Sequence, residues 1–172
     1  MFRSRVTICL LCVTILVLLL SAPVSLAESY HRGQFYLFSQ AFWEHIPRRL
    51  TGFGRFRFVL QPLVAIILGI RSGTHDARER RPPYLYAIVF RPDLRKQFLR
   101  SGFATVINLL LMGILMDAVC QWIILGTSHP AAALIVGPVL ILGPYSVARA
   151  LANRGARLIS NRSANRQTEQ PL

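Results

Sequence analysis

The chain has 172 residues, of which 53% are hydrophobic and only 16% are charged. Soluble globular domains carry about 25% charged residues, so this composition excludes an ordinary water-soluble protein. Lys and Arg number 20 against 7 Asp and Glu, which gives a net charge of +13. Because charged and apolar residues occupy separate stretches, the sequence predicts an all-α, polytopic membrane protein with three to four hydrophobic helices. No nucleic-acid partner is expected, since the basic residues stand beside membrane segments and not on a separate domain.

Residues 1–27 form a signal-like or amino-terminal anchor segment. Two arginines precede an apolar run from Val6 to Leu20, and small residues lie at and before Ala27. A basic start, an apolar core of about 15 residues and a small-residue end are typical of a secretory signal peptide. The same run also suits an uncleaved anchor helix, so both interpretations stay open. Residues 28–57 follow as a basic amphipathic or loop region.

Residues 58–151 form the predicted membrane domain, and its first apolar run is short. Phe58–Ile70 would reach about 20 Å as a helix, against a hydrocarbon thickness of about 30 Å. We therefore expect either a short span or an interfacial helix in this stretch. A longer span would draw Arg55 and Arg57 toward the lipid, and their side chains would reach back to the headgroups.

The second half of the membrane domain is predicted to form a C-terminal transmembrane hairpin. The apolar runs Phe103–Leu125 and Ala131–Leu151 are each long enough to cross a bilayer. The connection 126–130 has a turn composition and no Lys or Arg, so the positive-inside rule places it on the exported side. The basic tail 152–172 is expected to be largely disordered, from about Ser160 onward.

Residues 71–102 form a basic segment within the membrane domain that is expected to lie at the membrane interface. It contains eight basic and three acidic residues, an excess typical of the cytoplasmic side. A short apolar run from Tyr84 to Phe90 follows two prolines, and its tyrosines suit the boundary between water and lipid.

The end of this segment is predicted to be an amphipathic helix. Phe90, Leu94 and Phe98 recur every four residues and so share one helix face. The basic residues around this apolar stripe are Arg91, Arg95, Lys96 and Arg100. Such a helix can bind anionic lipid headgroups. The alternative is that these residues only set the topology.

Asp117 is an acidic residue inside a predicted span, where a carboxylate is costly and should face protein or a cavity. Gly113, Asp117 and Gln121 are four residues apart, so they lie on one helix stripe that we expect to face inward. Gln61 is a further expected partner if the first run crosses. Two hypotheses remain for this intramembrane polar site: a structural hydrogen bond, or a titrating group in a small transporter or channel subunit.

The sequence contains few motifs for catalysis, cofactors or metals. It has no Gly-rich phosphate loop, no His-Glu-x-x-His and no Gly-x-Ser-x-Gly. Cys9 and Cys12 have Cys-x-x-Cys spacing, but they lie inside the apolar amino-terminal run and are not expected to bind a metal. We therefore expect no catalytic residue, no cofactor and no metal site. The expectation is a non-enzymatic accessory or scaffold protein that contacts anionic membrane lipids, either as a homo-oligomer or with a membrane-protein partner.

The chain resembles a family of small uncharacterised bacterial integral membrane proteins over roughly residues 42–150. The motifs that carry this resemblance are Leu60-Gln61-Pro62-Leu63, Gly69-Ile70-Arg71, Asp76-Ala77-Arg78, Arg81-Pro82-Pro83-Tyr84, and Asp117 with Gln121. The Gly-Pro-interrupted last helix adds to it. The resemblance implies no activity, and with the charge pattern it leads us to expect a multi-pass protein of the bacterial inner membrane.

Overall fold

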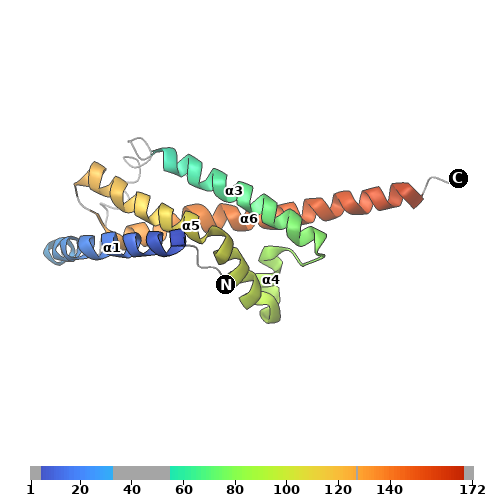
Figure 1. The fold of residues 1–172 in the computed structure, drawn as a ribbon, viewed down its shortest axis with the longest axis horizontal. Helices are drawn as coiled ribbons and strands as arrows, with labels where there is room; N and C mark the ends of the chain where they lie inside the picture. The colour runs from blue at the N-terminus through green and yellow to red at the C-terminus, as the bar shows by residue number, and fades with distance from the viewer. Residues whose placement is uncertain (1–4, 33–54, 127, 169–172) are drawn as a thin grey trace. The chain divides into compact units, whose positions relative to one another are not determined.

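The structure, a computed structural model, describes residues 5–32, 55–126 and 128–168. These residues form helices and short turns, without a strand (Figure 1). The helices are α1 (Arg5–Arg32), α3 (Arg55–Arg78), α4 (Tyr84–Phe90), α5 (Pro92–Leu125) and α6 (Pro130–Thr168). The predicted all-α fold is confirmed. All of these helices except α4 are long and apolar enough to span a membrane.

The chain divides into two compact units. Unit 1 comprises Met1–Pro62 and Ile107–Ile141, and unit 2 comprises Leu63–Val106 and Leu142–Leu172. Helices α3, α5 and α6 therefore contribute residues to both units. Most of the region 28–57 that the sequence assigns to a basic loop lies outside the described residues.

Helix α3 is longer than the apolar run within it. Its 24 residues reach about 36 Å, more than the hydrocarbon thickness of about 30 Å. The expected length of 13 residues is therefore corrected, because the helix continues through polar residues on both sides of the run, while the choice between a span and an interfacial helix stays a prediction. It ends where Arg80 adopts a positive φ of 57°, and the two prolines that follow disfavour helix further on.

Local signals also set the bounds of the hairpin formed by α5 and α6. Both helices begin at a proline, a residue that suits the first helical position because its missing N–H has no partner there. Helix α5 ends at Leu125, and the Gly126 that follows has a φ of 72° and donates to the Trp122 carbonyl at 2.9 Å. The predicted C-terminal hairpin is confirmed.

The four long helices alternate in direction within unit 1. On α5 and α6, Ala118 packs with Ala133 and Ile114 lies beside Gly137, so these helices are antiparallel. Helix α3 also runs antiparallel to α5. Helix α1 runs parallel to α5, because Thr14 contacts the Leu111 carbonyl and Ser25, later on α1, contacts His129, which follows α5. Alternating directions are what four consecutive membrane spans require.

In unit 2, α3 and α6 run parallel and in close contact. A Cβ atom on Gly69 would stand 2.6 Å from the Tyr145 carbonyl oxygen and 2.9 Å from the Ala148 Cβ. A Cβ atom on Gly73, one turn later, would collide with the Arg149 carbonyl oxygen. Gly69-x-x-x-Gly73 is thus a small-residue motif that lets two backbones approach inside a membrane.

The carboxyl-terminal tail corrects a further expectation. The sequence predicts disorder from about Ser160, but α6 continues to Thr168. No Gly or Pro interrupts residues 156–168, and Arg, Ala and Gln in this stretch favour helix. Extending a helix that already exists needs no new nucleation.

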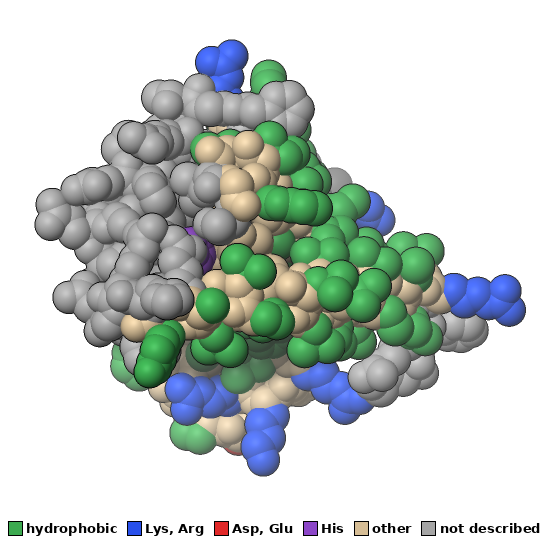
Figure 2. Space-filling view, turned by 90° about the vertical axis from the view of Figure 1, so that its left-hand side faces the viewer, with side chains coloured by type: hydrophobic (Ala, Val, Ile, Leu, Met, Phe, Trp, Pro, Cys, Tyr) green, Lys and Arg blue, Asp and Glu red, His purple; other side chains and the backbone are tan. Residues whose placement is uncertain are grey.

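Large apolar side chains are exposed along the four helices that are long and apolar enough to span a membrane. Figure 2 shows hydrophobic side chains over much of the face in view. In α1 only 6% of the most apolar window is buried. Such surfaces suit a lipid solvent, in which an exposed apolar side chain carries no penalty.

Candidate functional site

The predicted polar stripe on α5 faces the interior of unit 1. Gly113, Asp117 and Gln121 are all buried, and Asp117 and Gln121 are each only 1% exposed. The Gln121 Nε2 donates to the Asp117 Oδ2 at 2.6 Å. The inward orientation is therefore confirmed, while the functional role of the stripe stays a prediction.

Arg57 on α3 forms a buried salt bridge with Asp117. Its guanidinium group contacts the carboxylate Oδ1 and also lies 4.8 Å from the centre of the Phe58 ring. The expectation that Arg57 reaches back to the headgroups is wrong. A carboxylate at membrane depth is costly without a partner, and the nearby guanidinium offers the pairing that lowers this cost.

Gln61 lies one helical turn after Arg57 on α3. It contacts Gly113 and not Asp117, the partner that the sequence suggested. It is buried against Gly113, where a Cβ would stand 3.5 Å from its Nε2. Within the described residues its Oε1 has no hydrogen-bond partner. The structure thus brings Gln61 to the same stripe, but the carboxylate is held by Arg57 and Gln121.

The polar contacts continue from Asp117 toward the hairpin turn. The Gln121 Oε1 accepts from the His129 backbone N–H at 2.9 Å, and the His129 Nδ1 lies 3.3 Å from the Ser25 hydroxyl. One chain of contacts therefore joins α3, α5, the turn and α1. This arrangement ties three helices and the hairpin turn to a paired carboxylate.

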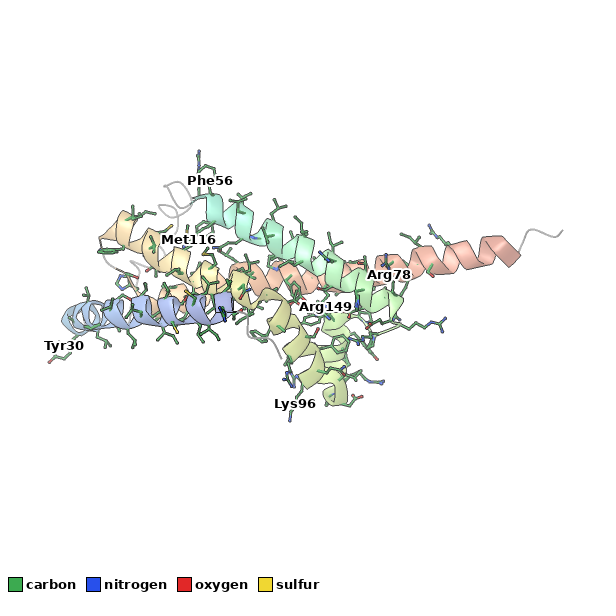
Figure 3. All side chains as sticks on the ribbon, in the orientation of Figure 1. Tyr30, Phe56, Arg78, Lys96, Met116 and Arg149 are labelled. Carbon is green, nitrogen blue, oxygen red and sulfur yellow. The ribbon has the colours of Figure 1, made fainter. Side chains whose placement is uncertain are left out.

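Unit 2 contains a second buried ion pair, between Arg149 of α6 and Asp76 of α3. The Arg149 Nε donates to the Asp76 Oδ2 at 2.7 Å, and its Nη2 donates to the Oδ1 at 3.1 Å. The Tyr145 hydroxyl accepts from Nη1 at 2.9 Å, and the Ser101 hydroxyl accepts from Nη2 at 3.3 Å. This bidentate geometry is the strongest form of an arginine–carboxylate contact. Arg149 is labelled in Figure 3.

Aromatic rings complete the surroundings of Arg149. The guanidinium carbon lies 4.5 Å from the centre of the Tyr84 ring and 5.7 Å from that of Phe98. Tyr84 is 4% exposed, so its ring packs inside unit 2, and the predicted interfacial position of this stretch stays a prediction. Burial raises the pKa of Tyr84, Tyr145 raises it further, and Arg149 opposes the rise.

The sequence analysis did not find the Arg149 cluster, although a spacing signal was present. Gly69, Gly73 and Asp76 share one face of α3, because they follow the spacing i, i+4, i+7. On α6, Tyr145 and Arg149 are likewise four residues apart. These spacings mark a face on each helix, but they do not show that the two faces meet.

The basic segment is exposed as expected at the start of α5. The side chains of Arg91, Arg95, Lys96 and Arg100 are all exposed, and Lys96 projects away from the helix in Figure 3. Phe98 on the apolar stripe is buried, Leu94 is half-buried and Phe90 is exposed. One face of this helical end is therefore anchored in unit 2 while the basic side chains reach outward.

Comparison of the chain with protein-family models, curated proteins and solved structures finds no match. The family resemblance in the sequence therefore stays a prediction. Among the described residues, no group of three or more His, Cys, Asp or Glu side chains could hold a metal ion.

Proposed function

We propose that the protein is a non-enzymatic accessory or scaffold of the bacterial inner membrane that binds anionic lipid headgroups. The proposed contact residues are Arg91, Arg95, Lys96 and Arg100. The observation that carries this proposal is an exposed basic cluster beside an exposed apolar helix. In α4, Tyr84 and Ala87 are buried, whereas Leu85, Tyr86, Val89 and Phe90 are exposed.

This juxtaposition suits a membrane interface. The exposed apolar face of α4 can lie against the acyl boundary, and the positive side chains that follow it stand at headgroup level. Each Lys or Arg near an anionic surface contributes about 1 kcal/mol. Arg91 lies 3.6 Å from Asp93, but an exposed pair of this kind is weak and leaves the guanidinium able to bind a phosphate.

The Arg149 cluster supports the proposal by fixing the elements that carry the basic side chains. Arg149 contacts Tyr84 at the start of α4 and Ser101 on α5. Asn153 donates to the Arg81 carbonyl at 3.2 Å, in the turn that precedes α4. The interface segment is thus tied to α6 at three points.

The contacts of Asp117 support a structural role over the transporter or channel alternative. Arg57 and Gln121 contact the two carboxylate oxygens. A group held in this way stabilises the bundle without any transported species.

The test compares lipid binding by two charge variants of the full chain. The interface variant replaces Arg91, Arg95, Lys96 and Arg100 with Gln. The control variant also removes four positive charges, but at other exposed positions, namely Arg55, Arg71, Arg154 and Arg162. Short-chain phosphatidylglycerol and phosphatidylcholine are titrated into detergent-purified protein, and bound lipid is counted by native mass spectrometry.

We expect the interface variant to bind phosphatidylglycerol at least tenfold more weakly, while phosphatidylcholine binding stays unchanged. The control variant should lose less than threefold. Raising the salt concentration should weaken the wild-type interaction, since exposed charges are screened. Equal losses in both variants would show that only total charge matters and would overturn the proposed site.

A further inference from the structure

A groove runs between α1 and α5 within unit 1. It encloses about 360 Å³, within the range of small-molecule sites. The lining residues of the two helices are Val17, Leu20, Ser21 and Val24 on α1, and Ala118, Val119 and Trp122 on α5. Their spacing follows one face of each helix, so the groove is parallel to both helices.

The groove has an apolar length and a polar end. From Val17 to Val24 it extends about 10 Å along the helix axis. The remaining lining residues, Gly126 and Ser128, belong to the hairpin turn that follows α5. Ser128 is 9% exposed, and its hydroxyl has no hydrogen-bond partner among the described residues. A buried hydroxyl without a partner is costly, so this end of the groove is ready for an acceptor.

The polar end and the apolar length of the groove lie at the depths of the ester groups and the acyl chains of a phospholipid. Because Ser128 lies just beyond the end of α5, it stands near the level of the glycerol esters when α5 spans the bilayer. Trp122 is 69% exposed and lies one turn before that end, as tryptophan does at membrane interfaces. Ala118 and Val17 lie deeper, where only hydrocarbon is present.

We propose that this groove seats one acyl chain of a membrane phospholipid, whose ester carbonyl accepts a hydrogen bond from the Ser128 hydroxyl. The groove uses none of the proposed headgroup residues and does not depend on the headgroup proposal. It requires that α1 is retained in the mature protein and that α1 and α5 cross the membrane.

The first measurement is the intact mass of the purified protein. Retention of residues 1–27 is expected, because Val17, Leu20, Ser21 and Val24 form one wall of the groove. A mature chain that lacks these residues has no groove, and this result would overturn the proposal.

The second measurement uses Trp122 as a reporter. Trp43 is replaced by Phe, which leaves Trp122 as the single tryptophan of the chain. Phosphatidylcholine with brominated acyl chains is titrated into the detergent-purified protein, and fluorescence quenching is followed. We expect quenching that saturates at one lipid per protein. Ser128→Ala should raise the lipid concentration at half-maximal quenching at least threefold. Ser21→Phe, which fills the groove, should abolish saturation.

A matched control places the reporter outside the groove. Met116 on α5 is 41% exposed and is not a lining residue. A variant with Trp122→Phe and Met116→Trp should show gradual quenching without saturation. Identical curves at both positions would overturn the proposal, because they indicate only the lipid annulus. Tighter saturation by a brominated free fatty acid than by the phospholipid would overturn the choice of ligand. Circular dichroism checks that each variant keeps its helices.

Discussion

Each unit of the molecule buries one arginine–aspartate pair, and the two pairs differ in how completely their polar atoms are partnered. In unit 2, Arg149 binds Asp76 through two nitrogens and also contacts two hydroxyls and aromatic rings. In unit 1, the Asp117 carboxylate is held by Arg57 and Gln121. The Nε and Nη1 of Arg57 have no hydrogen-bond partner within the described residues.

Burial of an ion pair therefore does not by itself measure its stabilising effect. A buried pair recovers its desolvation cost only when the remaining donors and acceptors are also satisfied. By this criterion the pair of unit 2 is a completed structural contact, and the pair of unit 1 is a weaker one. Substitutions in the two pairs should therefore differ in their effect on stability.

Of the substitutions considered, Arg149→Met should lower stability most. This change leaves Asp76 as a buried charge without its guanidinium partner, and we expect the free energy of unfolding to fall by about 3–5 kcal/mol. Unfolding in mixed detergent micelles measures the loss. The double variant Arg149→Met with Asp76→Leu should recover most of it, since an apolar pair leaves no charge unpaired. A loss below 1 kcal/mol would contradict the assignment of a completed contact.

A smaller effect is expected for Asp117→Asn in unit 1. The amide removes the charge that Arg57 faces but keeps an oxygen within reach of Gln121. We expect a loss of about 1.5–3 kcal/mol in the same unfolding measurement. A double-mutant cycle with Arg57→Gln isolates the coupling between the two residues. If the two single losses simply add, the salt bridge does not contribute to stability.

The backbone contact of unit 2 can be tested with a matched pair of glycine substitutions on neighbouring helices. A methyl group at Gly73 would collide with the Arg149 carbonyl, whereas nothing lies within 4 Å of a Cβ at Gly155. We expect Gly73→Ala to cost about 1 kcal/mol through overpacking. Gly155→Ala should stabilise by about 0.5–1 kcal/mol through helix propensity. The same sign for both changes would contradict the close approach.

The smallest effect concerns pH and applies to unit 2. The pKa of Tyr84 is raised in the folded protein, so above about pH 10 the unfolded chain loses this proton first. Its contribution to stability is present below that pH and is lost as the pH rises through the folded pKa. We expect wild-type protein to lose more stability between pH 9 and 11 than Tyr84→Phe. Parallel pH profiles would show that Tyr84 does not titrate in this way.

The sequence predicts the helices better than the contacts between them. Hydropathy found the hairpin, and the four-residue spacing of Asp117 and Gln121 found the buried stripe. The sequence did not predict Arg57 as the partner of Asp117, because Arg57 precedes the apolar run. The length of that run also underestimates the length of α3. The pairing of Asp76 with Arg149 joins residues 73 positions apart. No local pattern fixes such a pairing, which depends on the close approach at Gly73.

The Arg57–Asp117 salt bridge has a consequence for how the protein is made. Helix α3 is synthesised before α5, so Arg57 leaves the ribosome before Asp117 does. A lone carboxylate costs about 2.5–3.5 kcal/mol at the translocon, and a guanidinium already placed in a preceding span lowers this cost at the moment when α5 enters the bilayer. In a membrane-inserted chain, the order of the two residues would therefore make Arg57 of α3 available as a counterion before Asp117 of α5 enters the bilayer.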